Sequence, residues 1–448
     1  MAETVNSLSE TLTLLVSAKK YSAVRDVLET MHAADIAVML DECDGEVAPL
    51  LFRLLPKELA ADTFVEMQED QQKMLIQGFS DSELKDVVDE LYVDDAADLV
   101  EEMPANVVRR ILKQAGPEKR KMINEILKYP EDSAGSIMTT EYVSLRPDMT
   151  VEDAIKRIRR TGIDKETINT CYVMADNRKL LGIVTIRALL LADENVTMKE
   201  IMTEEVISAL TTEDRESVAL DFNKYDLSAM PVVDEENRLV GIVTVDDVMD
   251  VLQEETTEDI EKMAAITPLD KPYLKTAVFK MYLSRIPWLL ILMFSATFTG
   301  GIITHYENAL THITLVASIP MLMATGGNCG SQASVTIIRG LSIGEIEFRD
   351  VLRVIWKEIR VALLCGITLA LINFLVLVFI SGTAVNVAAV ICITLLVTVA
   401  VAKAVGCSLP MVASKIGFDP AVMASPFITT IIDAVCLMIY VNIAMRIL

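Results

Sequence analysis

One carboxylate stands inside an otherwise apolar stretch near the C-terminus. Asp433 falls in DPAVMASPFITTIIDAVCL (residues 419–437), and no Lys or Arg lies within ten residues of it on either side. An ionised side chain at the centre of a membrane helix costs about 2.5–3.5 kcal/mol. Asp419, which opens the stretch as DPA, fits a helix N-cap followed by Pro. Asp433 is either protonated in a helix interface or facing water and cations, and the missing basic partner favours the second.

Small and polar residues in a second apolar stretch suit the same chemistry. In MLMATGGNCGSQASVT (residues 321–336), Asn328 and Gln332 are four residues apart and share one face of a helix. Gly326 and Gly330 form a GxxxG pattern, which is typical of close helix packing. Small residues also expose backbone carbonyls. Together with Thr429 and the intramembrane carboxylate, these oxygens are predicted to line a hydrated cation path.

Carboxylates also recur at helical spacing in MDVLQEETTEDIEKM (residues 249–263). Asp250, Glu254 and Glu258 follow one another every four residues, and Glu255 and Asp259 form a neighbouring pair. Like charges at this spacing destabilise an isolated helix by about 0.2–0.5 kcal/mol per pair. The pattern fits either a solvated polar face or a cation-binding surface. Because all the ligands are hard oxygens, the second interpretation points to Mg²⁺ or Ca²⁺.

Five apolar runs are expected to position the membrane residues, at 284–305, 312–337, 359–381, 385–409 and 421–446. Each reaches the roughly 20 residues that a helix needs to cross a bilayer. Lys and Arg gather before the first run and between the second and third, and Lys403 and Lys415 flank the connection from the fourth to the fifth. Positive segments stay in the cytoplasm. The prediction is a multi-pass protein of the plasma membrane, with residues 1–280 inside and the C-terminus outside. An odd number of spans favours a symmetric homodimer.

The part of the chain before these runs is strongly acidic. Residues 1–270 carry 28 Lys and Arg against 57 Asp and Glu, whereas residues 271–448 carry 12 against 7. Such a surface repels phosphates, which excludes nucleic acid as a partner and favours cations. Residues 1 to about 130 predict short amphipathic helices without strands, and Ser80 with Glu83 has the spacing of a capping box. Their repetition predicts a stack of helical hairpins.

Residues 131–252 contain an internal repeat. SIMTTEYVSL (136–145) is echoed by EIMTEEVISA (200–209), and KLLGIVTIRALL (179–190) by RLVGIVTVDDVM (238–249). Each copy predicts a strand, a helix, a strand, a GIVT strand and a final helix. The repeat resembles a tandem pair of CBS domains, which implies a regulatory module of a kind that often binds adenosine nucleotides.

The nucleotide contacts implied by this resemblance differ between the two copies. The Thr-x-x-Asp motif is present as Thr244 and Asp247, but Thr185 is followed by Ala188, so the first copy lacks the ribose-binding carboxylate. The implied contacts are therefore Thr185, Arg187 and Thr244, with ATP as the candidate ligand. A CBS pair that only transmits conformational change remains the alternative.

The order of these parts is similar to that of the MgtE family of bacterial magnesium channels. The motifs that carry this resemblance are TGGNCGSQ (325–332), the LP at 409 and GFDPAVMASPFITTIIDAVCL (417–437). The resemblance implies a homodimer with an N-terminal helical domain, a CBS pair, an amphipathic plug helix and five membrane helices per subunit. It also implies that Asp433 binds hydrated Mg²⁺ in a pore lined by Asn328, Gly326 and Thr429.

The same resemblance implies that cytosolic Mg²⁺ closes the pore by bridging carboxylates of the N-terminal domain, the CBS pair and the plug helix. The matching acids are Glu58, Asp94, Asp98, Glu216, Asp226, Asp247, Asp250, Glu255, Glu258 and Asp259.

The predicted fold is a multidomain membrane protein. It comprises an all-α helical-hairpin domain (1–130), an α/β tandem CBS pair (131–252), an amphipathic connecting helix (253–280) and a five-helix transmembrane domain (281–448). The predicted function is a non-enzymatic, Mg²⁺-selective channel for uptake down the electrochemical gradient, closed by intracellular Mg²⁺. Two hypotheses compete with it: an intramembrane aspartyl hydrolase, which needs two carboxylates, and a membrane sensor that transports nothing. The sequence has no Walker A motif to drive pumping by ATP.

Overall fold

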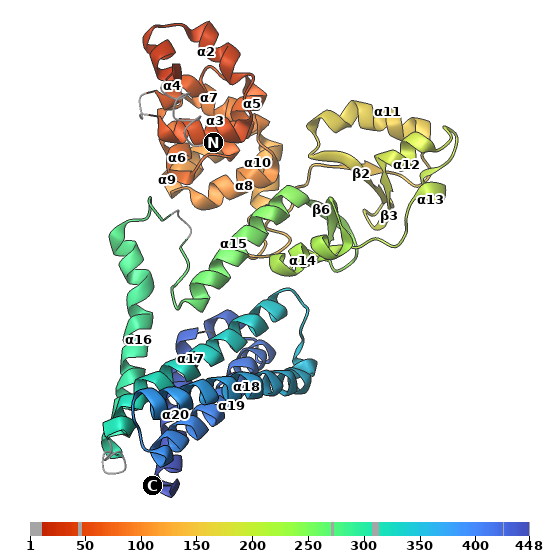
Figure 1. Cartoon of the computed structure of the whole chain (residues 1–448). Helices are drawn as coiled ribbons and strands as arrows, with labels where there is room; N and C mark the ends of the chain where they lie inside the picture. The colour runs from red at the N-terminus through yellow and green to blue at the C-terminus, as the bar shows by residue number, and fades with distance from the viewer. Residues whose placement is uncertain (1–10, 44–46, 270–272, 307–312, 424, 448) are drawn as a thin grey trace. The chain divides into compact units, whose positions relative to one another are not determined.

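The computed structural model describes residues 11–43, 47–269, 273–306, 313–423 and 425–447 (Figure 1). Its contacts divide the chain into two units, Met1–Val251 and Leu252–Leu448. Helix α15 (Val245–Met263) runs through the boundary between them. The helix therefore begins earlier and ends earlier than the connecting helix expected at 253–280.

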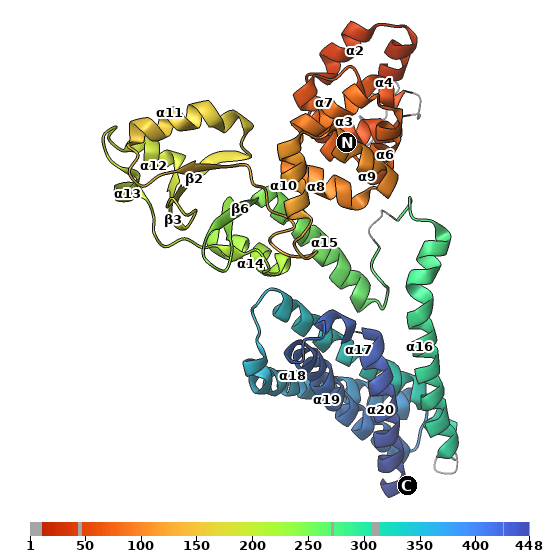
Figure 2. The ribbon, with the colours of Figure 1, turned by 180° about the vertical axis from the view of Figure 1, so that it is seen from behind.

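Short helices build the first part of the first unit. Residues 11–17 are helical, and α2 (Tyr21–Leu28), α3 (Ala33–Glu42), α4 (Ala48–Phe52), α5 (Lys57–Val65), α6 (Glu69–Gly78), α7 (Asp81–Glu90), α8 (Val93–Glu102), α9 (Ala105–Gln114) and α10 (Pro117–Ile126) follow. Alternate helices pack on one another, α3 on α5, α5 on α7 and α7 on α9. Their apolar faces share one core that includes Leu40, Phe64 and Leu84. This confirms the expected helical stack, coloured red to orange in Figures 1 and 2.

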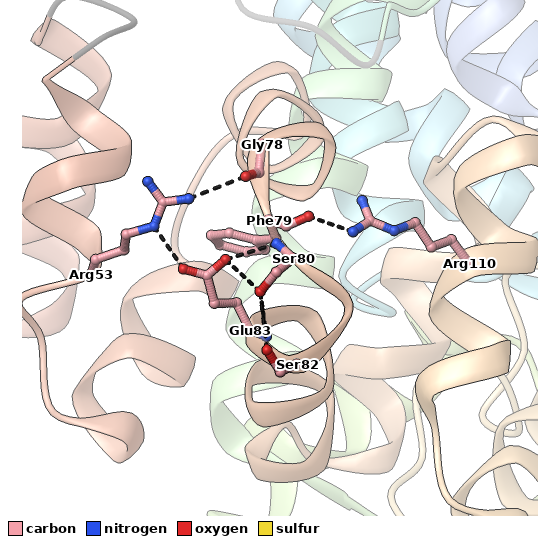
Figure 3. Close-up of polar contacts among 7 residues, drawn as sticks. All are labelled: Arg53, Gly78, Phe79, Ser80, Ser82, Glu83 and Arg110. Carbon is pink, nitrogen blue, oxygen red and sulfur yellow. Dashed lines mark hydrogen bonds and ion pairs between the residues drawn. The ribbon is translucent and has the colours of Figure 1, made fainter.

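The start of α7 shows how a local sequence signal fixes one of these helices (Figure 3). The Ser80 hydroxyl accepts a hydrogen bond from the Glu83 backbone N–H, and the Glu83 carboxylate accepts one from Ser80 N at 2.7 Å, so the predicted capping box is present. Arg53 Nε donates to Glu83 Oε1 at 2.7 Å. The Arg53 hydrogen bond and the Ser80 backbone N–H lower the pKa of Glu83 to about 2. Arg110 donates to the Phe79 carbonyl and ties α9 to the same turn.

Two copies of one α/β unit follow. The first contains β1 (Tyr142–Leu145), α11 (Val151–Thr161), the 3-10 turn η1 (Gly162–Asp164), β2 (Thr167–Met174), β3 (Leu180–Thr185) and α12 (Ile186–Leu191). The second contains α13 (Met198–Ile201), β4 (Ala209–Leu210), α14 (Arg215–Tyr225), β5 (Ala229–Val233) and β6 (Leu239–Thr244) before α15. Each copy forms a three-stranded sheet in which the first two strands run parallel and the last two antiparallel. The predicted repeat is thus confirmed.

The repeated glycines and threonines have a reciprocal structural role. Thr139 of the first copy exchanges two backbone hydrogen bonds of 2.8 Å with Ile242 of the second. Thr203 of the second copy exchanges bonds of 2.9 and 3.0 Å with Ile183 of the first. A Cβ on Gly241 would lie 2.6 Å from the Thr139 carbonyl oxygen, so a larger residue would force the two copies apart.

Five long helices make up most of the second unit. They are α16 (Val278–His305), α17 (Ile313–Ser342), α18 (Val351–Leu375), α19 (Val385–Lys415) and α20 (Ser425–Ile447). The 3-10 turns η3 (Phe348–Asp350) and η5 (Pro420–Met423) precede α18 and α20, and a π-helical turn η4 (Val376–Ile380) extends α18. Four described segments are long and apolar enough to cross a bilayer: Val278–His305, Phe348–Ile380, Val385–Lys415 and Pro420–Ile447. Helix α17 has 30 residues, ample length for a span, but it carries the glycines and amides of TGGNCGSQ and is not among the four.

Helix α17 packs against both α19 and α20, whereas α16 lies along α20 and α18 along α19. These helices bury Leu322, Leu395 and Tyr440 in a common core. The Tyr440 hydroxyl donates to the Leu315 carbonyl at 2.9 Å, which satisfies its only polar atom inside that core. Helix α17, with its short TGGNCGSQ stretch, is therefore packed against α19 and against α20, which carries Asp433.

Candidate functional site

A buried carboxylate opens helix α8. Asp94 lies in the first turn, where the helix dipole favours an anion. Its side chain is only 6% exposed, and its Oδ1 atom has no hydrogen-bond partner. Burial, followed by repulsion from Asp247, Asp95 and Glu166, holds the pKa of Asp94 well above its usual range. An unpartnered oxygen of this kind is costly unless a proton or a cation satisfies it.

The acids that face Asp94 come from the α/β repeat. Asp247, in the first turn of α15, accepts a hydrogen bond of 2.7 Å from the Thr244 hydroxyl. Burial is the main cause that raises the pKa of Asp247 to about 6. Burial and the charges of Asp247 and Asp246 raise the pKa of Glu166 to about 8, and Glu166 Oε2 is also buried without a partner. We call Asp94, Asp95, Glu166, Asp246 and Asp247 the unit-1 acidic cluster.

Two neighbours complete the surroundings of this cluster. Glu141 Oε2 accepts the Val93 backbone N–H at 3.3 Å, linking the loop before β1 to the start of α8. Lys119 of α10 lies near Glu141 and Asp95. Burial raises the pKa of both carboxyl groups, and the positive charge of Lys119 reverses only part of that rise. One ammonium therefore offsets only part of the charge of six or more carboxylates.

The other predicted gating acids of the first unit are more dispersed. Asp98 is on the exposed side of α8, close enough to Asp247 to repel it. Glu58 is in the first turn of α5 beside Asp62, and Glu216 is in the first turn of α14. Asp226 ends α14 in the left-handed region, with φ of 51°. Asp250 lies one turn after Asp246 on α15 and is repelled by it.

A second group of acids lies in the second unit. Glu258, Asp259 and Glu255 are on the last turns of α15. The ammonium of Lys262 contacts Glu258 Oε1 at 2.5 Å and Asp419 Oδ2 at 2.7 Å, and Asp259 Oδ2 accepts the Ser342 hydroxyl at 3.1 Å. Asp419 Oδ1 also accepts the Ala421 backbone N–H at 2.8 Å. Asp419 thus caps the 3-10 turn η5, and not α20, which begins at Ser425.

Neither group already has the geometry of a metal site. Among the described residues, no three Asp, Glu, His or Cys side chains are close enough together to hold a metal ion. The donor chemistry of the unit-1 acidic cluster nevertheless fits Mg²⁺, because its oxygens are hard ligands and two of them are buried without partners. A cation entering here has to draw the carboxylates closer together.

The predicted pore residues lie on α17 and α20. Asp433 is half-buried in the single chain, one helical turn after Thr429. A Cβ on Gly327 would be 3.1 Å from Thr429 Cγ2, so the two helices are in contact at this level. Gly326 is buried against Thr398 and Ile432 of the neighbouring helices, whereas Asn328 is exposed on the single chain.

The structure corrects the interpretation of Lys403 as part of a connection. Lys403 is inside α19, and its Nζ is 3.1 Å from Glu358 Oε2 of α18. The two side chains are 7% and 15% exposed. Glu358 lies about two turns inside α18. The pair neutralises both charges between two membrane helices, because an unpaired charge there would be far more costly.

The predicted nucleotide contacts have different surroundings in the two α/β copies, as the sequence indicated. The Thr185 hydroxyl accepts the Ala188 backbone N–H at 3.2 Å and caps α12, and Arg187 is exposed on that helix. In the second copy Thr244 is paired with a carboxylate, which already belongs to the unit-1 acidic cluster.

The sequence did not single out Glu166, Glu141 or Asp95 as candidate ligands. Both glutamates stand in loops of the first α/β copy, where no spacing rule connects them to α8. The one available signal was the density of acids in the first 270 residues.

Sequence models of three known domains match this chain. The MgtE family, described as a divalent cation transporter, matches residues 319–443. The MgtE intracellular N domain matches residues 31–132, and CBS domains match residues 134–195 and 198–254.

Full-length relatives are similar over nearly the whole chain. A protein of Thermus thermophilus named magnesium transporter MgtE is 37% identical over 429 residues, which covers 94% of each chain. A Bacillus subtilis protein of the same name is 31% identical over 436 residues, or 96% of this chain and 95% of the relative.

Solved structures of cytosolic parts are also similar. The cytosolic domain of the Mg²⁺ channel MgtE in complex with ATP has a TM-score of 0.52 and 36% identity, over 54% of this chain and 99% of that chain. The soluble part of a magnesium transporter has a TM-score of 0.53 and 29% identity, over 56% of this chain and 99% of that chain. Because residues 319–443, the helical N-terminal part and the paired α/β repeats are all matched, and relatives of this name are similar over nearly the whole chain, the chain belongs to the MgtE family of divalent cation transporters.

Proposed function

We propose that this membrane protein is a channel through which Mg²⁺ enters the cell down its electrochemical gradient. The observation that carries the proposal is Asp433, an acid of an apolar helix for which the described residues provide no ion pair. Relatives named magnesium transporters support Mg²⁺ as the substrate. Two charges crossing 100 mV gain about 4.6 kcal/mol, so uptake needs no other energy source.

The residues that would line the ion path are on α17 and α20, which are in contact at Gly327 and Thr429. Asp433 supplies the charge that attracts a hydrated dication, while Thr429, Asn328 and the backbone near Gly326 supply neutral oxygens. Mg²⁺ dehydrates reluctantly and usually keeps several waters, so one carboxylate with hydrogen-bonding neighbours suits it better than an all-protein cage. A homodimer would place two copies of Asp433 around one path.

Closure by intracellular Mg²⁺ is the second part of the proposal. The unit-1 acidic cluster joins carboxylates of the helical stack to carboxylates of the α/β repeat, and burial, followed by their mutual repulsion, raises the pKa values of Asp94 and Glu166. Mg²⁺ relieves this repulsion, so its binding would hold the two parts together. The predicted gating acids of the first unit that would act in this role are Glu58, Asp94, Asp98, Glu216, Asp226, Asp247 and Asp250. Glu255, Glu258 and Asp259 are the predicted Mg²⁺ ligands at the membrane end of α15.

The location and the other ligands follow from the same proposal. Residues 1–280 lie in the cytoplasm and the C-terminus outside, because Lys and Arg gather on the predicted inner side. A related cytosolic domain has been solved with ATP, so an adenosine nucleotide between the two α/β copies is an additional candidate ligand. Membership of a transporter family leaves the aspartyl hydrolase hypothesis without support.

Flux measurements on the full chain in liposomes test the proposal. Asp433→Asn keeps the size of the side chain and removes its charge, and uptake of Mg²⁺ is expected to fall at least about tenfold, equivalent to about 1.4 kcal/mol. Glu345→Gln removes an exposed acid between α17 and η3 and serves as the matched control. Normal uptake by a correctly inserted Asp433→Asn protein would refute the pore assignment. Absence of flux through the unmodified chain would favour the sensor hypothesis.

A further inference from the structure

The last turns of α15 are attached to the membrane helices of the same unit through a lysine. Lys262 Nζ lies 2.5 Å from Glu258 Oε1 and 2.7 Å from Asp419 Oδ2. The side chains of Lys262, Glu258 and Asp419 are 26%, 34% and 34% exposed, so this ion pair is more protected than a typical surface pair. Glu258 is one turn before Lys262 on α15, whereas Asp419 is separated from it by four membrane helices. The ion pair with Asp419 is therefore the one that joins α15 to the start of η5.

Further contacts that are not ion pairs join the end of α15 to α17 and η5. Met263 packs against Ile338 of α17 and Ala421 of η5, both of which are buried. The Ser342 hydroxyl at the end of α17 donates to Asp259 Oδ2. The end of α15 is thus in contact with α17 and with the segment that leads into α20, the two helices that carry the predicted pore residues.

The charge balance at this contact depends on Lys262. Three carboxylates meet here, on Glu258, Asp259 and Asp419, and Asp419 is close enough to repel Asp259. Two carboxylates about 5 Å apart near a surface repel each other by about 3 kcal/mol. The ammonium of Lys262 lies between two of the three and converts their repulsion into attraction. The chain itself supplies the cation that this contact requires.

We propose that Lys262 is a built-in tether that keeps the end of α15 attached to the start of η5 when no divalent cation is present. The tether itself rests only on the contacts above, while its meaning for pore closure rests on the proposed function. In that setting, falling Mg²⁺ releases the acids of the first unit, and the membrane end of α15 stays in place. Because the end of α15 stays joined to α17 and η5, a movement of α15 would then be passed directly to the helices that carry the predicted pore residues.

Disulfide trapping in the full chain tests the tether. Met263→Cys and Ala421→Cys are introduced together, mild oxidation is applied in detergent with EDTA, and the linked peptide is quantified by mass spectrometry. Because a specific peptide is measured, the seven native cysteines can remain. The pair is expected to link readily in EDTA, and adding Lys262→Met is expected to lower the linked fraction about fivefold, the effect of losing one good ion pair.

Three further variants make the result specific. Lys262→Arg keeps the charge and is expected to retain linking. Asp419→Asn keeps an amide oxygen for the Ala421 N–H but loses the charge, and is expected to behave like Lys262→Met. Lys85→Met removes an exposed positive charge in the first unit and should change nothing. If Lys262→Met links in EDTA as well as the parent pair does, the tether is refuted. No flux is measured in this experiment, so its outcome is independent of whether the chain conducts Mg²⁺.

Discussion

Two carboxylates within apolar helices, Glu358 and Asp433, have different surroundings. Glu358 is paired with Lys403 at 3.1 Å and is almost fully buried, so its charge is neutralised within one chain. Asp433 has no ion-pair partner among the residues that the structure describes and remains half-exposed on the single chain. A paired charge between helices serves packing, whereas an unpaired one invites a cation or water. This contrast is the strongest residue-level argument for Asp433 as the ion-binding group.

The raised pKa values of the unit-1 acidic cluster predict that the stability of the contact between α8 and the α/β repeat depends on pH. Folding raises the pKa of Glu166 to about 8 and that of Asp247 to about 6. Without divalent cations, the contact between α8 and the α/β repeat is therefore most stable below the unfolded pKa of about 4. It loses that stability as the pH rises through 6 to 8, because these carboxylates must then ionise next to one another.

Mg²⁺ binding near pH 7 should consequently release protons. Calorimetry of the full chain in buffers with different ionisation enthalpies measures this release. Glu166→Gln is expected to reduce it, while Glu345→Gln in the other unit leaves it unchanged. The same proton release from the Glu166→Gln protein would show that Glu166 does not take part in the cation-dependent step.

Ala188 predicts weak nucleotide binding by the first α/β copy. The Thr185 hydroxyl accepts a hydrogen bond from the Ala188 backbone N–H, whereas the Thr244 hydroxyl of the second copy donates to the Asp247 carboxylate at 2.7 Å. A hydrogen bond to a charged group is worth about 1.5–3 kcal/mol, so Ala188→Asp is expected to tighten ATP binding at least about tenfold. Titration of the full chain with ATP measures the change. Tight binding to the unmodified chain, with no gain from Ala188→Asp, would contradict this prediction.

At the scale of elements, the crossing of α17 and α19 depends on two glycines. A Cβ on Gly406 would overlap the backbone of Gly330, which cannot move away as a flexible side chain can. Gly406→Ala is therefore expected to separate the helices and to destabilise the membrane part by about 1–3 kcal/mol. Thermal unfolding in detergent measures the loss.

Gly300→Ala is the matched control for this crossing. Gly300 is also inside a membrane helix, but a Cβ there meets nothing within 4 Å. Because Ala favours a helix over Gly by about 1 kcal/mol, this variant should be as stable as the unmodified chain or more so. Equal losses in the two variants would mean that the close approach of α17 and α19 is unimportant.

At the scale of the whole molecule, the uneven charge predicts a response to cations. Residues 1–270 carry 57 acidic against 28 basic side chains, so their parts repel one another until cations bind. One millimolar site contributes only about 4 kcal/mol, while a switch from mostly open to mostly closed needs about 5.5 kcal/mol of differential binding. The proposed closure by Mg²⁺ would therefore require several weak sites that fill together, which fits a dispersed set of acids better than one tight site.

Trypsin cleavage of the full chain tests this response. Lys128 follows the helical stack and Lys275 precedes α16, and cleavage at both is expected to slow in millimolar Mg²⁺. K⁺ at the same ionic strength should protect much less, because screening alone does not bridge carboxylates. Equal protection by the two salts would rule out a specific Mg²⁺ response. Asp247→Asn combined with Asp94→Asn should remove the Mg²⁺ effect.

The sequence by itself determined the features that repeat along the chain. The internal repeat predicted the strands of both α/β copies, and the Ser80–Glu83 spacing predicted a capping box. Four of the five apolar runs coincide with described helices that are long and apolar enough to cross a membrane. These features depend on neighbours within a few turns, so local periodicity is enough to reveal them. The lone carboxylate at Asp433 was visible for the same reason, since its apolar surroundings are its sequence neighbours.

Only the tertiary structure decided which charges meet. Lys403 was expected to flank a connection, but it pairs with Glu358, 45 residues earlier, because α18 and α19 pack side by side. Glu166 lies close to Asp94, although the two are 72 residues apart in the sequence. Lys262 forms an ion pair with Asp419, although four long helices lie between them in the sequence. A charge interacts through space with whatever the packed elements bring within a few ångströms, and sequence spacing contains no information about that distance.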